Sequence, residues 1–423
     1  MVFRLVSESV ESQLLARGLS RTLPNPMIRR TVKALSKTNN MLILSEAEVR
    51  QCFPVRAAIE CNRKALSSLR KDGHGGAIVP TRIGLPYNPS LCHGDVSSAP
   101  STDWSLFKPA AYYSPNGSDQ SSRGSENRER EASDDIIMGM KVVSVRANNP
   151  SIGKPTVPAT VMLLDPESGE VSAIMAATYL TAARTAAGSA LATELAFRNN
   201  PQKMKDSLTL VVFGAGLQAE LHIKSIQHVV KLKEVIIVNR SLERAQKLKE
   251  SLLQSETNEN CWDVPINIST MLLSNKKGVQ NAVQEADVIV TATNTCVPLF
   301  SGEWVKPGCH INGVGSFTPQ MKEVDDTLVQ RCEVLIDTSE ALDVGDLSYL
   351  KSTDERKVSN NIGLIGDALV GTVTFGTLRD DPTNQMDCTF YKSVGTAIQD
   401  VVSAQYVSNM ASTMNGVGIN VEM

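Results

Sequence analysis

LTLVVFGAGLQA, residues 208–219, joins an apolar run of strand length to a glycine-rich turn. Leu208–Phe213 has the composition of a buried parallel strand. Gly214 permits a tight turn after that strand, Gly216 allows a pyrophosphate to approach the backbone, and Ala219 is small enough for close helix–strand packing. A helix that starts at the turn offers free N–H groups to an anion. The stretch therefore predicts a dinucleotide-binding turn.

Further apolar runs of strand length follow the turn and alternate with segments of helical pattern. They are Val235–Val238, Ala286–Thr291, His310–Val314 and Val334–Asp337. Strands that alternate with helices are typical of α/β proteins in which helices cover both faces of a parallel sheet. We therefore expect a Rossmann-type, doubly wound parallel sheet over residues 205–365.

Residues 41–200 have a different pattern and indicate an α+β domain. Its expected strands and helices are Met41–Leu44, Val49–Leu69 after a capping box at Ser45 and Glu48, Met138–Val145, Thr160–Leu164, Val171–Met175 and Thr181–Phe197. Residues 115–135 are polar throughout, which predicts a mobile loop. We expect the tail, residues 366–423, to pack back on this first domain.

Residues 1–40 form a basic extension with several serines and threonines. Such a composition fits a disordered extension, and it also resembles a mitochondrial transit peptide. Glu8 and Glu11 count against the transit peptide, because such peptides are poor in acids. We therefore expect a disordered extension and a cytoplasmic protein, with a mitochondrial location as the alternative.

The overall composition excludes several classes of function. A net charge of −3 provides no basic surface for nucleic acid or anionic membrane, and no run of residues is apolar enough to span a bilayer. The 8 cysteines and 5 histidines are scattered without the spacing of a metal site. We therefore expect no metal, free thiols and a reducing compartment.

The end of the second predicted nucleotide-domain strand bears on the choice of cofactor. An NAD-selective site usually has an acid there to bind the ribose hydroxyls. This chain has Asn239-Arg240, with Arg244 a turn later. An arginine can pair with a 2′-phosphate, which an acid would repel. The pair favours NADP(H) over NAD(H), although Arg240 could instead be a solvated loop residue.

Three cations outside the nucleotide domain are candidates for substrate binding. Arg82 lies between two prolines, Lys141 lies inside the apolar strand, and Arg184 lies in the alanine-rich helix. Lysine and arginine are rarely buried without a partner. The partner could be a ligand carboxylate or a structural ion pair, and spacing alone leaves both open.

Ordered matches along residues 41–410 resemble the ornithine cyclodeaminase/μ-crystallin family. They include Thr181–Ala187, GAGLQA followed by His222, Asn239-Arg240, Ala286–Thr293, His310–Gly315 and Lys392–Gly395. The resemblance implies an NAD(P)-dependent homodimer whose substrate-binding and dimerisation domain is built from both ends of the chain. It also implies that Arg82, Lys141 and Arg184 hold the substrate carboxylate near the nicotinamide, and that Lys141 in addition polarises the reacting C=N or C=O group.

The resemblance extends the expected set of cofactor and pocket residues. The expected cofactor contacts are Gly214, Gly216, Leu217, Gln218, Ala219, Asn239, Arg240, Arg244, Thr291, Ala292, Thr293 and Val314. Phe317 and Lys392 are expected in the substrate pocket.

One position departs from the cyclodeaminase pattern. Members that remove ammonia carry an acid two residues after the Val-Gly where this chain has Val314-Gly315, and Phe317 occupies that place. Reductase members of the family also lack the acid. We therefore expect an NAD(P)H-dependent reductase of a small imino carboxylic acid, with ornithine cyclodeaminase and a non-catalytic, crystallin-like binding protein as alternatives. If Phe317 is only a core aromatic, Glu323 or Asp325 could supply the missing acid.

Overall fold

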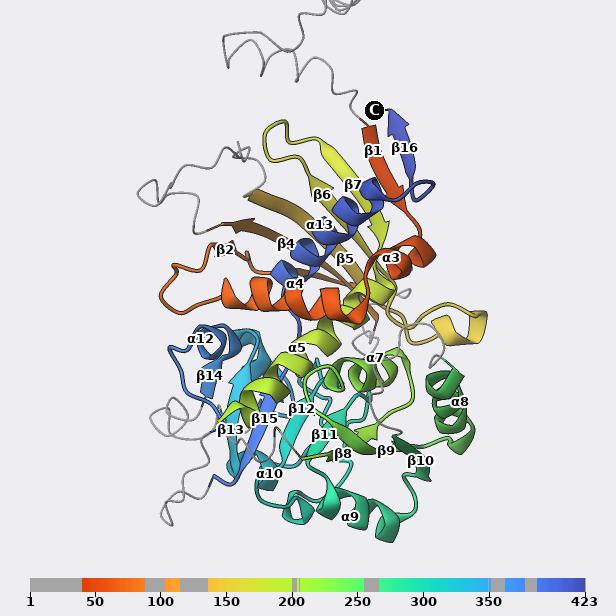
Figure 1. Cartoon of the computed structure of the whole chain (residues 1–423), viewed down its shortest axis with the longest axis vertical. Helices are drawn as coiled ribbons and strands as arrows, with labels where there is room; N and C mark the ends of the chain where they lie inside the picture. The colour runs from red at the N-terminus through yellow and green to blue at the C-terminus, as the bar shows by residue number, and fades with distance from the viewer. Residues whose placement is uncertain are drawn as a thin grey trace, which may run out of the picture.

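The computed structural model describes residues 40–87, 103–114, 136–199, 204, 206–254, 266–348, 350, 362–376 and 386–422. Each half of the molecule is built around one eight-stranded sheet, and helix α5 lies between the two halves (Figure 1). The predicted mobile loop 115–135 and the predicted extension, apart from Asn40, lie outside the described residues.

The lower half in Figure 1 contains a parallel sheet with the strand order β10-β9-β8-β11-β12-β15-β13-β14. All of its neighbouring strands pair in parallel. The strands are β8 (Leu208–Phe213), β9 (Leu232–Asn239), β10 (Asn267–Leu272), β11 (Val288–Thr291), β12 (His310–Gly313), β13 (Cys332–Ile336), β14 (Ile362–Leu364) and β15 (Cys388–Lys392).

Helices bury apolar side chains against both faces of this sheet. Helices α7 (Leu217–Ile226) and α8 (Leu242–Gln254) belong to one buried cluster. Helices α9 (Lys276–Glu285) and α10 (Asp326–Gln330) belong to the other. This arrangement confirms the predicted doubly wound α/β fold.

Strand β15 corrects the predicted domain boundary at residue 366. We expected the chain to leave the nucleotide domain there, but β15 lies in the parallel sheet between β12 and β13. The chain returns to the first half only after Lys392, through α13 (Ala397–Thr413) and β16 (Ile419–Glu422). The spacing of apolar runs along the sequence does not show which strands pair, so it did not predict that β15 pairs with β12 and β13.

The upper half contains a mixed sheet with the order β16-β1-β7-β6-β5-β4-β2, and β3 also pairs with β4. The strands are β1 (Asn40–Leu44), β2 (Ala77–Ile78), β3 (Ile83–Tyr87), β4 (Asp103–Tyr113), β5 (Ile136–Val145), β6 (Ala159–Leu164) and β7 (Val171–Ala176). Helix α13 crosses β4, β5 and β6, and it also packs on α4 (Figure 1). Both ends of the described chain therefore contribute to this half.

The predicted helix Val49–Leu69 is two helices. The capping box at Ser45 and Glu48 is confirmed, and it starts α3 (Glu46–Cys52). Pro54 then caps α4 (Val55–Ser67). A proline disfavours helical geometry in the residue before it, which explains the break.

Helix α5 (Thr178–Arg198) is alanine-rich because it is buried between the two halves. It packs against α4 on one side and α7 on the other. The His222 imidazole links α5 to α7, with Nε2 3.0 Å from Ser189 Oγ and Nδ1 2.7 Å from the Gln218 carbonyl oxygen. Arg184 on α5 thus lies at the junction of the two halves. The remaining helix of this junction is α12 (Ile365–Val370), which also contacts α4.

Candidate functional site

The phosphate-binding turn has the geometry that its sequence predicts. Gly214 has φ 121°, and a Cβ there would lie 2.6 Å from the Ala292 carbonyl oxygen. Gly216 precedes α7 in extended conformation, and a Cβ there would meet nothing within 4 Å. Ala219 is fully buried against the sheet. The first glycine is therefore required by the fold, whereas the second opens space at a helix N-terminus, which fits a dinucleotide pyrophosphate.

A buried carboxylate organises the loops beside this turn. Glu323 accepts hydrogen bonds from Thr291 Oγ1 at 2.9 Å, from the Thr293 N–H and Oγ1 at 2.7 Å, and from the Gly315 N–H at 2.7 Å. It also accepts one from the Ser316 N–H at 3.2 Å. Burial raises the pKa of Glu323, and Lys392 opposes that rise. Glu323 thereby holds together Thr291, the last residue of β11, and Thr293 and Gly315, which follow β11 and β12.

The residues expected to select the cofactor lie after β9. Asn239 donates from its side-chain amide to the Ser241 carbonyl oxygen at 2.9 Å, and Ser241 Oγ accepts from the Arg244 N–H. The side chains of Arg240 and Arg244 are exposed. Arg240 makes no ion pair with any residue that the structure describes.

The structure brings Lys141 and Arg184 together on one carboxylate that sequence analysis missed. Lys141 Nζ lies 2.7 Å from Asp400 Oδ2, and Arg184 Nε lies 2.8 Å from Asp400 Oδ1. All three side chains are at least 95% buried. Burial lowers the pKa of Lys141 well below its usual value, and the neighbouring Arg184 adds to that shift. Because α13 carries Asp400, the partner came from the far end of the sequence.

Lys108 is a third buried cation, and sequence analysis missed it as well. It lies directly across from Lys141 in the register between β4 and β5. Its Nζ donates to the Gly395 carbonyl oxygen at 2.8 Å, and its side chain is 5% exposed. Burial lowers its pKa to about 8. The sequence analysis predicted no strand at β4, and Lys108 belongs to no sequence motif that would have identified it.

Gly395 connects these cations to the loop after β15. It has φ +77°, and a Cβ there would lie 2.6 Å from Arg184 Nη1. Asp337 Oδ2 accepts from the Gly395 N–H at 2.6 Å and from Ser393 Oγ at 2.9 Å. The Asp337 carboxylate thus fixes the loop whose carbonyl accepts from Lys108.

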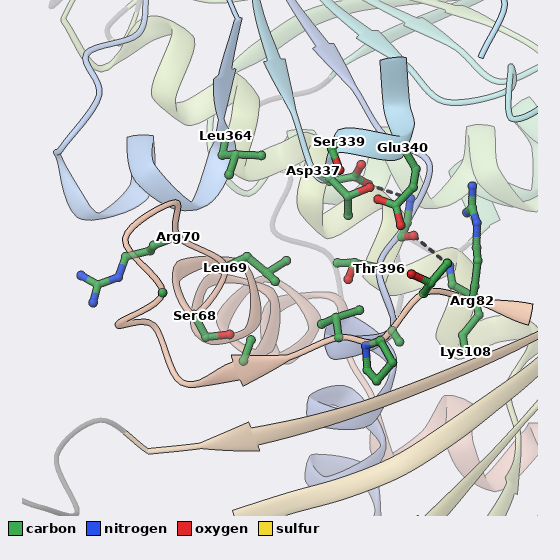
Figure 2. Close-up of a pocket in the computed structure, with 18 residues that line it drawn as sticks. Ser68, Leu69, Arg70, Arg82, Lys108, Asp337, Ser339, Glu340, Leu364 and Thr396 are labelled. Atoms are coloured by element: carbon green, nitrogen blue, oxygen red, sulfur yellow. Dashed lines mark hydrogen bonds between the residues drawn. The ribbon is translucent and has the colours of Figure 1, made fainter. Parts of the chain in front are cut away.

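A cavity of about 390 Å³ opens beside this loop, between the two halves of the molecule. Figure 2 shows Asp337 and Glu340 on one side of it and Arg82 and Lys108 on another. Burial acts to raise the pKa of Glu340, but the charges of Arg82 and Lys108 are among the influences that lower it below its usual value. Arg82 and Lys108 line the cavity, whereas Lys141 and Arg184 do not.

Two predicted pocket residues have other surroundings. Lys392 is fully buried, pairs with Asp346 at 2.8 Å and does not line the cavity. The family resemblance placed Lys392 in the substrate pocket, whereas its carboxylate partner comes from the segment after β13. Phe317 is 37% exposed and also lies outside the cavity lining, so it is not a core aromatic.

The two acids considered as replacements at position 317 have structural roles. Glu323 is fully buried and bound by the strand-end loops. Asp325 caps α10 through the Leu328 N–H and accepts from the Gly302 N–H at 2.9 Å. Neither lines the cavity.

Comparison with known proteins agrees with this architecture. A profile described as the ornithine cyclodeaminase/mu-crystallin family matches residues 130–415. The chain belongs to this family. An uncharacterized cyclodeaminase of Dictyostelium discoideum is 31% identical over 402 residues, which cover 90% of this chain and 100% of that protein.

Two other relatives of this chain are named for a specific reaction. Ketimine reductase mu-crystallin of Macropus fuliginosus is 33% identical over 65% of this chain and 76% of its own length. The structure of Thermococcus litoralis Δ1-pyrroline-2-carboxylate reductase in complex with NADH and L-proline superposes with a TM-score of 0.69. It is 25% identical and covers 90% of this chain and 100% of that one.

Proposed function

We propose that the protein is an NAD(P)H-dependent reductase that converts the C=N bond of a small imino carboxylic acid to an amine. The observation that carries the proposal is the excess of positive charge beside the cavity. Four cations, Arg82, Lys108, Lys141 and Arg184, gather here with three carboxylates, Asp337, Glu340 and Asp400. Buried charge without a counter-ion is costly, so such a cluster favours a bound anion. Relatives that reduce pyrroline-2-carboxylate and ketimines supply the reaction class.

The roles of the residues follow from this placement. When bound, the reduced nicotinamide supplies a hydride to the C=N carbon. Arg82 and Arg184 hold the substrate carboxylate and fix which carbon faces the cofactor. Lys141 stabilises charge at the nitrogen or protonates it. Asp400 keeps Lys141 and Arg184 at a fixed separation, since each of its oxygens contacts one of them.

Phe317 favours reduction over cyclodeamination. It has no group that accepts a proton or orients water, and Glu323 and Asp325 are engaged elsewhere. Reduction needs no carboxylate at that place. Ornithine cyclodeaminase remains the second candidate because a named relative is a cyclodeaminase. A purely structural protein would need no converging cations, so Arg82, Lys141 and Arg184 count against that role.

One assay separates the three candidates. We expect purified protein to consume NADPH with Δ1-pyrroline-2-carboxylate, followed by absorbance, and to release no ammonia from ornithine with NAD⁺. Ammonia release at a useful rate would establish the cyclodeaminase instead. Binding of the imino acid without any turnover would favour the binding protein.

For the cofactor we propose NADP(H), on the basis of the exposed Arg240 after β9. Arg240→Asp should weaken NADPH binding by about 1–3 kcal/mol, the scale of a lost charged contact plus repulsion. NADH binding should change much less. Calorimetric titration of both cofactors tests this, and equal losses would remove Arg240 from the phosphate site.

We also propose a homodimer that forms through the sheet of the upper half. Strand β3 is exposed along its whole length, and its Ile83 and Leu85 side chains are 62% and 52% exposed. Large exposed apolar side chains on one strand mark an interaction surface. Light scattering should give twice the chain mass for the wild type and a lower mass after Ile83→Lys with Leu85→Lys. An unchanged mass would place the interface elsewhere.

A further inference from the structure

Lys108 differs from the other buried cations in what it contacts. Lys141 and Arg184 each lie against an oxygen of Asp400. Lys108 donates to the Gly395 carbonyl oxygen, and no carboxylate within the described residues pairs with it. An ammonium has three protons to donate, so its hydrogen-bonding capacity is not filled. It is also the one of these three that lines the cavity.

The backbone around Lys108 holds its ammonium at the cavity. Gly395 has a positive φ, and its amide is held by Asp337. Its carbonyl oxygen therefore keeps a fixed direction toward Lys108. On the other side, the pairing of β4 with β5 places Lys108 beside Lys141, and the two like charges repel each other. The position suits an anion that enters from the cavity.

We propose that Lys108 is a further substrate-binding residue, whose ammonium pairs with the carboxylate of the imino acid at the cavity wall. This rests on the proposed function and adds to it a cation that the expected set, Arg82, Lys141 and Arg184, does not contain. The Gly395 carbonyl oxygen and the substrate carboxylate together satisfy the ammonium. Lys108 thus makes recognition depend on a carboxylate, rather than on the ring alone.

Protonation of Lys108 then controls binding. Burial lowers its pKa to about 8, so the ammonium is present below that pH and lost above it. The substrate carboxylate should bind to the protonated form, and the KM for the substrate should rise as the pH increases through about 8.

The groups that face Lys108 are Asp400 on α13, Arg184 on α5, Lys141 on β5, Asp337 after β13, Glu340 in the following turn and Arg82 before β3. Among them, the pKa of Asp400 and of Glu340 is lowered, so neither is expected to titrate near pH 8.

The test is steady-state kinetics with NADPH and Δ1-pyrroline-2-carboxylate from about pH 6 to about pH 10. For the wild type we expect KM to rise roughly tenfold per pH unit above about 8. Lys108→Met should raise KM at pH 7 by about ten- to a hundredfold, with a smaller change in kcat, and should abolish the rise above pH 8. Lys108→Arg should keep KM near the wild-type value and remain flat to high pH, because a guanidinium stays charged.

A binding measurement keeps the proposal separate from the reaction assignment. With NADP⁺-loaded protein, L-proline should bind the Lys108→Met variant more weakly than the wild type. Pyrrolidine, which lacks the carboxylate, should not distinguish the two. Lys64→Met is the matched control. Lys64 lies on α4, does not line the cavity, and places its ammonium 4.4 Å from the ring centroid of Tyr112, which is on the same strand as Lys108.

Two sets of outcomes decide between the proposals. A Lys108→Met variant with KM within twofold of the wild type, or with the rise above pH 8 intact, overturns the role of Lys108. A wild type that turns over no imino acid, yet binds L-proline in a Lys108-dependent way, overturns the proposed reaction and leaves Lys108 as a carboxylate ligand. If the wild type neither turns over nor binds these carboxylates, both proposals fail.

Discussion

Lys392 and Lys141 are both buried and were both expected in the substrate site, but the balance of charge around them differs. Lys392 and its partner Asp346 are both fully buried, and Asp346 Oδ1 also accepts from the Glu323 N–H at 2.6 Å. Lys141 shares Asp400 with Arg184, while Lys108 approaches the same group of charges from the cavity side. The first cluster has a carboxylate for its one cation, and the second has more cations than carboxylates.

The difference shows that burial alone does not identify a functional lysine. A buried ion pair with further hydrogen bonds is complete and stabilises the arrangement around it. Lys392, through Asp346, anchors the segment that carries Glu323 and therefore the cofactor loops. A cluster with surplus positive charge and access to a cavity is incomplete until an anion binds. The count of charges, together with access, separates structural support from a binding site.

The largest expected effect is on stability, at the complete cluster. Lys392→Met leaves Asp346 buried without its cation, which should lower the free energy of unfolding by about 3–5 kcal/mol. Denaturant unfolding without cofactor measures the change. Lys247→Met is the control, because Lys247 pairs with Glu243 on an exposed helix surface and should leave the midpoint unchanged. A small loss for Lys392→Met would show that the two clusters do not differ as described.

The next effect is on activity, at the incomplete cluster. Arg184→Ala should reduce kcat/KM about a hundredfold, on the order of 3 kcal/mol, because it removes a charged contact to the substrate carboxylate. The protein should remain folded, since Asp400 keeps Lys141 as a partner. Cofactor affinity should barely change.

The control for that variant lies on the same helix. Arg198→Ala removes a half-exposed cation of α5 that pairs with Glu194 at 3.7 Å, and it should leave kcat/KM unchanged. If Arg184→Ala instead unfolds as readily as Lys392→Met, the Arg184–Asp400 pair is structural, and the distinction between the clusters is lost.

Local patterns in the sequence predicted the parts of the fold that depend on local physics. The turn at Gly214 and Gly216 is specified by steric limits on a few residues, and the capping box at Ser45 by a three-residue spacing. Lys141 and Arg184 could be singled out because an apolar or alanine-rich context makes a charge conspicuous. Each of these features lies within one short segment.

The partners of those charges could not be predicted in the same way. Asp400 lies 216 residues after Arg184 in the sequence, and it meets Arg184 only because α13 crosses back over the first sheet. Likewise β15 enters the parallel sheet from beyond the predicted boundary. Lys108 stood in no motif, and its importance follows from its place opposite Lys141. Contacts between distant segments decide which charges are balanced.

The smallest expected effect tests the comparison through stability rather than activity. If Lys108 lacks a counter-ion, replacing it should stabilise the protein without ligand. The fall in its pKa from 10.5 to about 8 corresponds to about 3 kcal/mol, and the lost hydrogen bond to Gly395 offsets about 1–2 kcal/mol. Lys108→Met should therefore raise the free energy of unfolding by about 1–2 kcal/mol at pH 7.

Below pH 8 the lysine is charged in both folded and unfolded states, so the folded state bears the full cost of burial. Between about pH 8 and 10.5 only the unfolded state keeps the proton, so wild-type stability rises and the advantage of the variant shrinks. Denaturant unfolding of both proteins at pH 7, 8.5 and about 10 measures this trend. A variant that is less stable than the wild type at pH 7 would mean that Lys108 is as well partnered as Lys392. The cavity would then carry no surplus positive charge from Lys108.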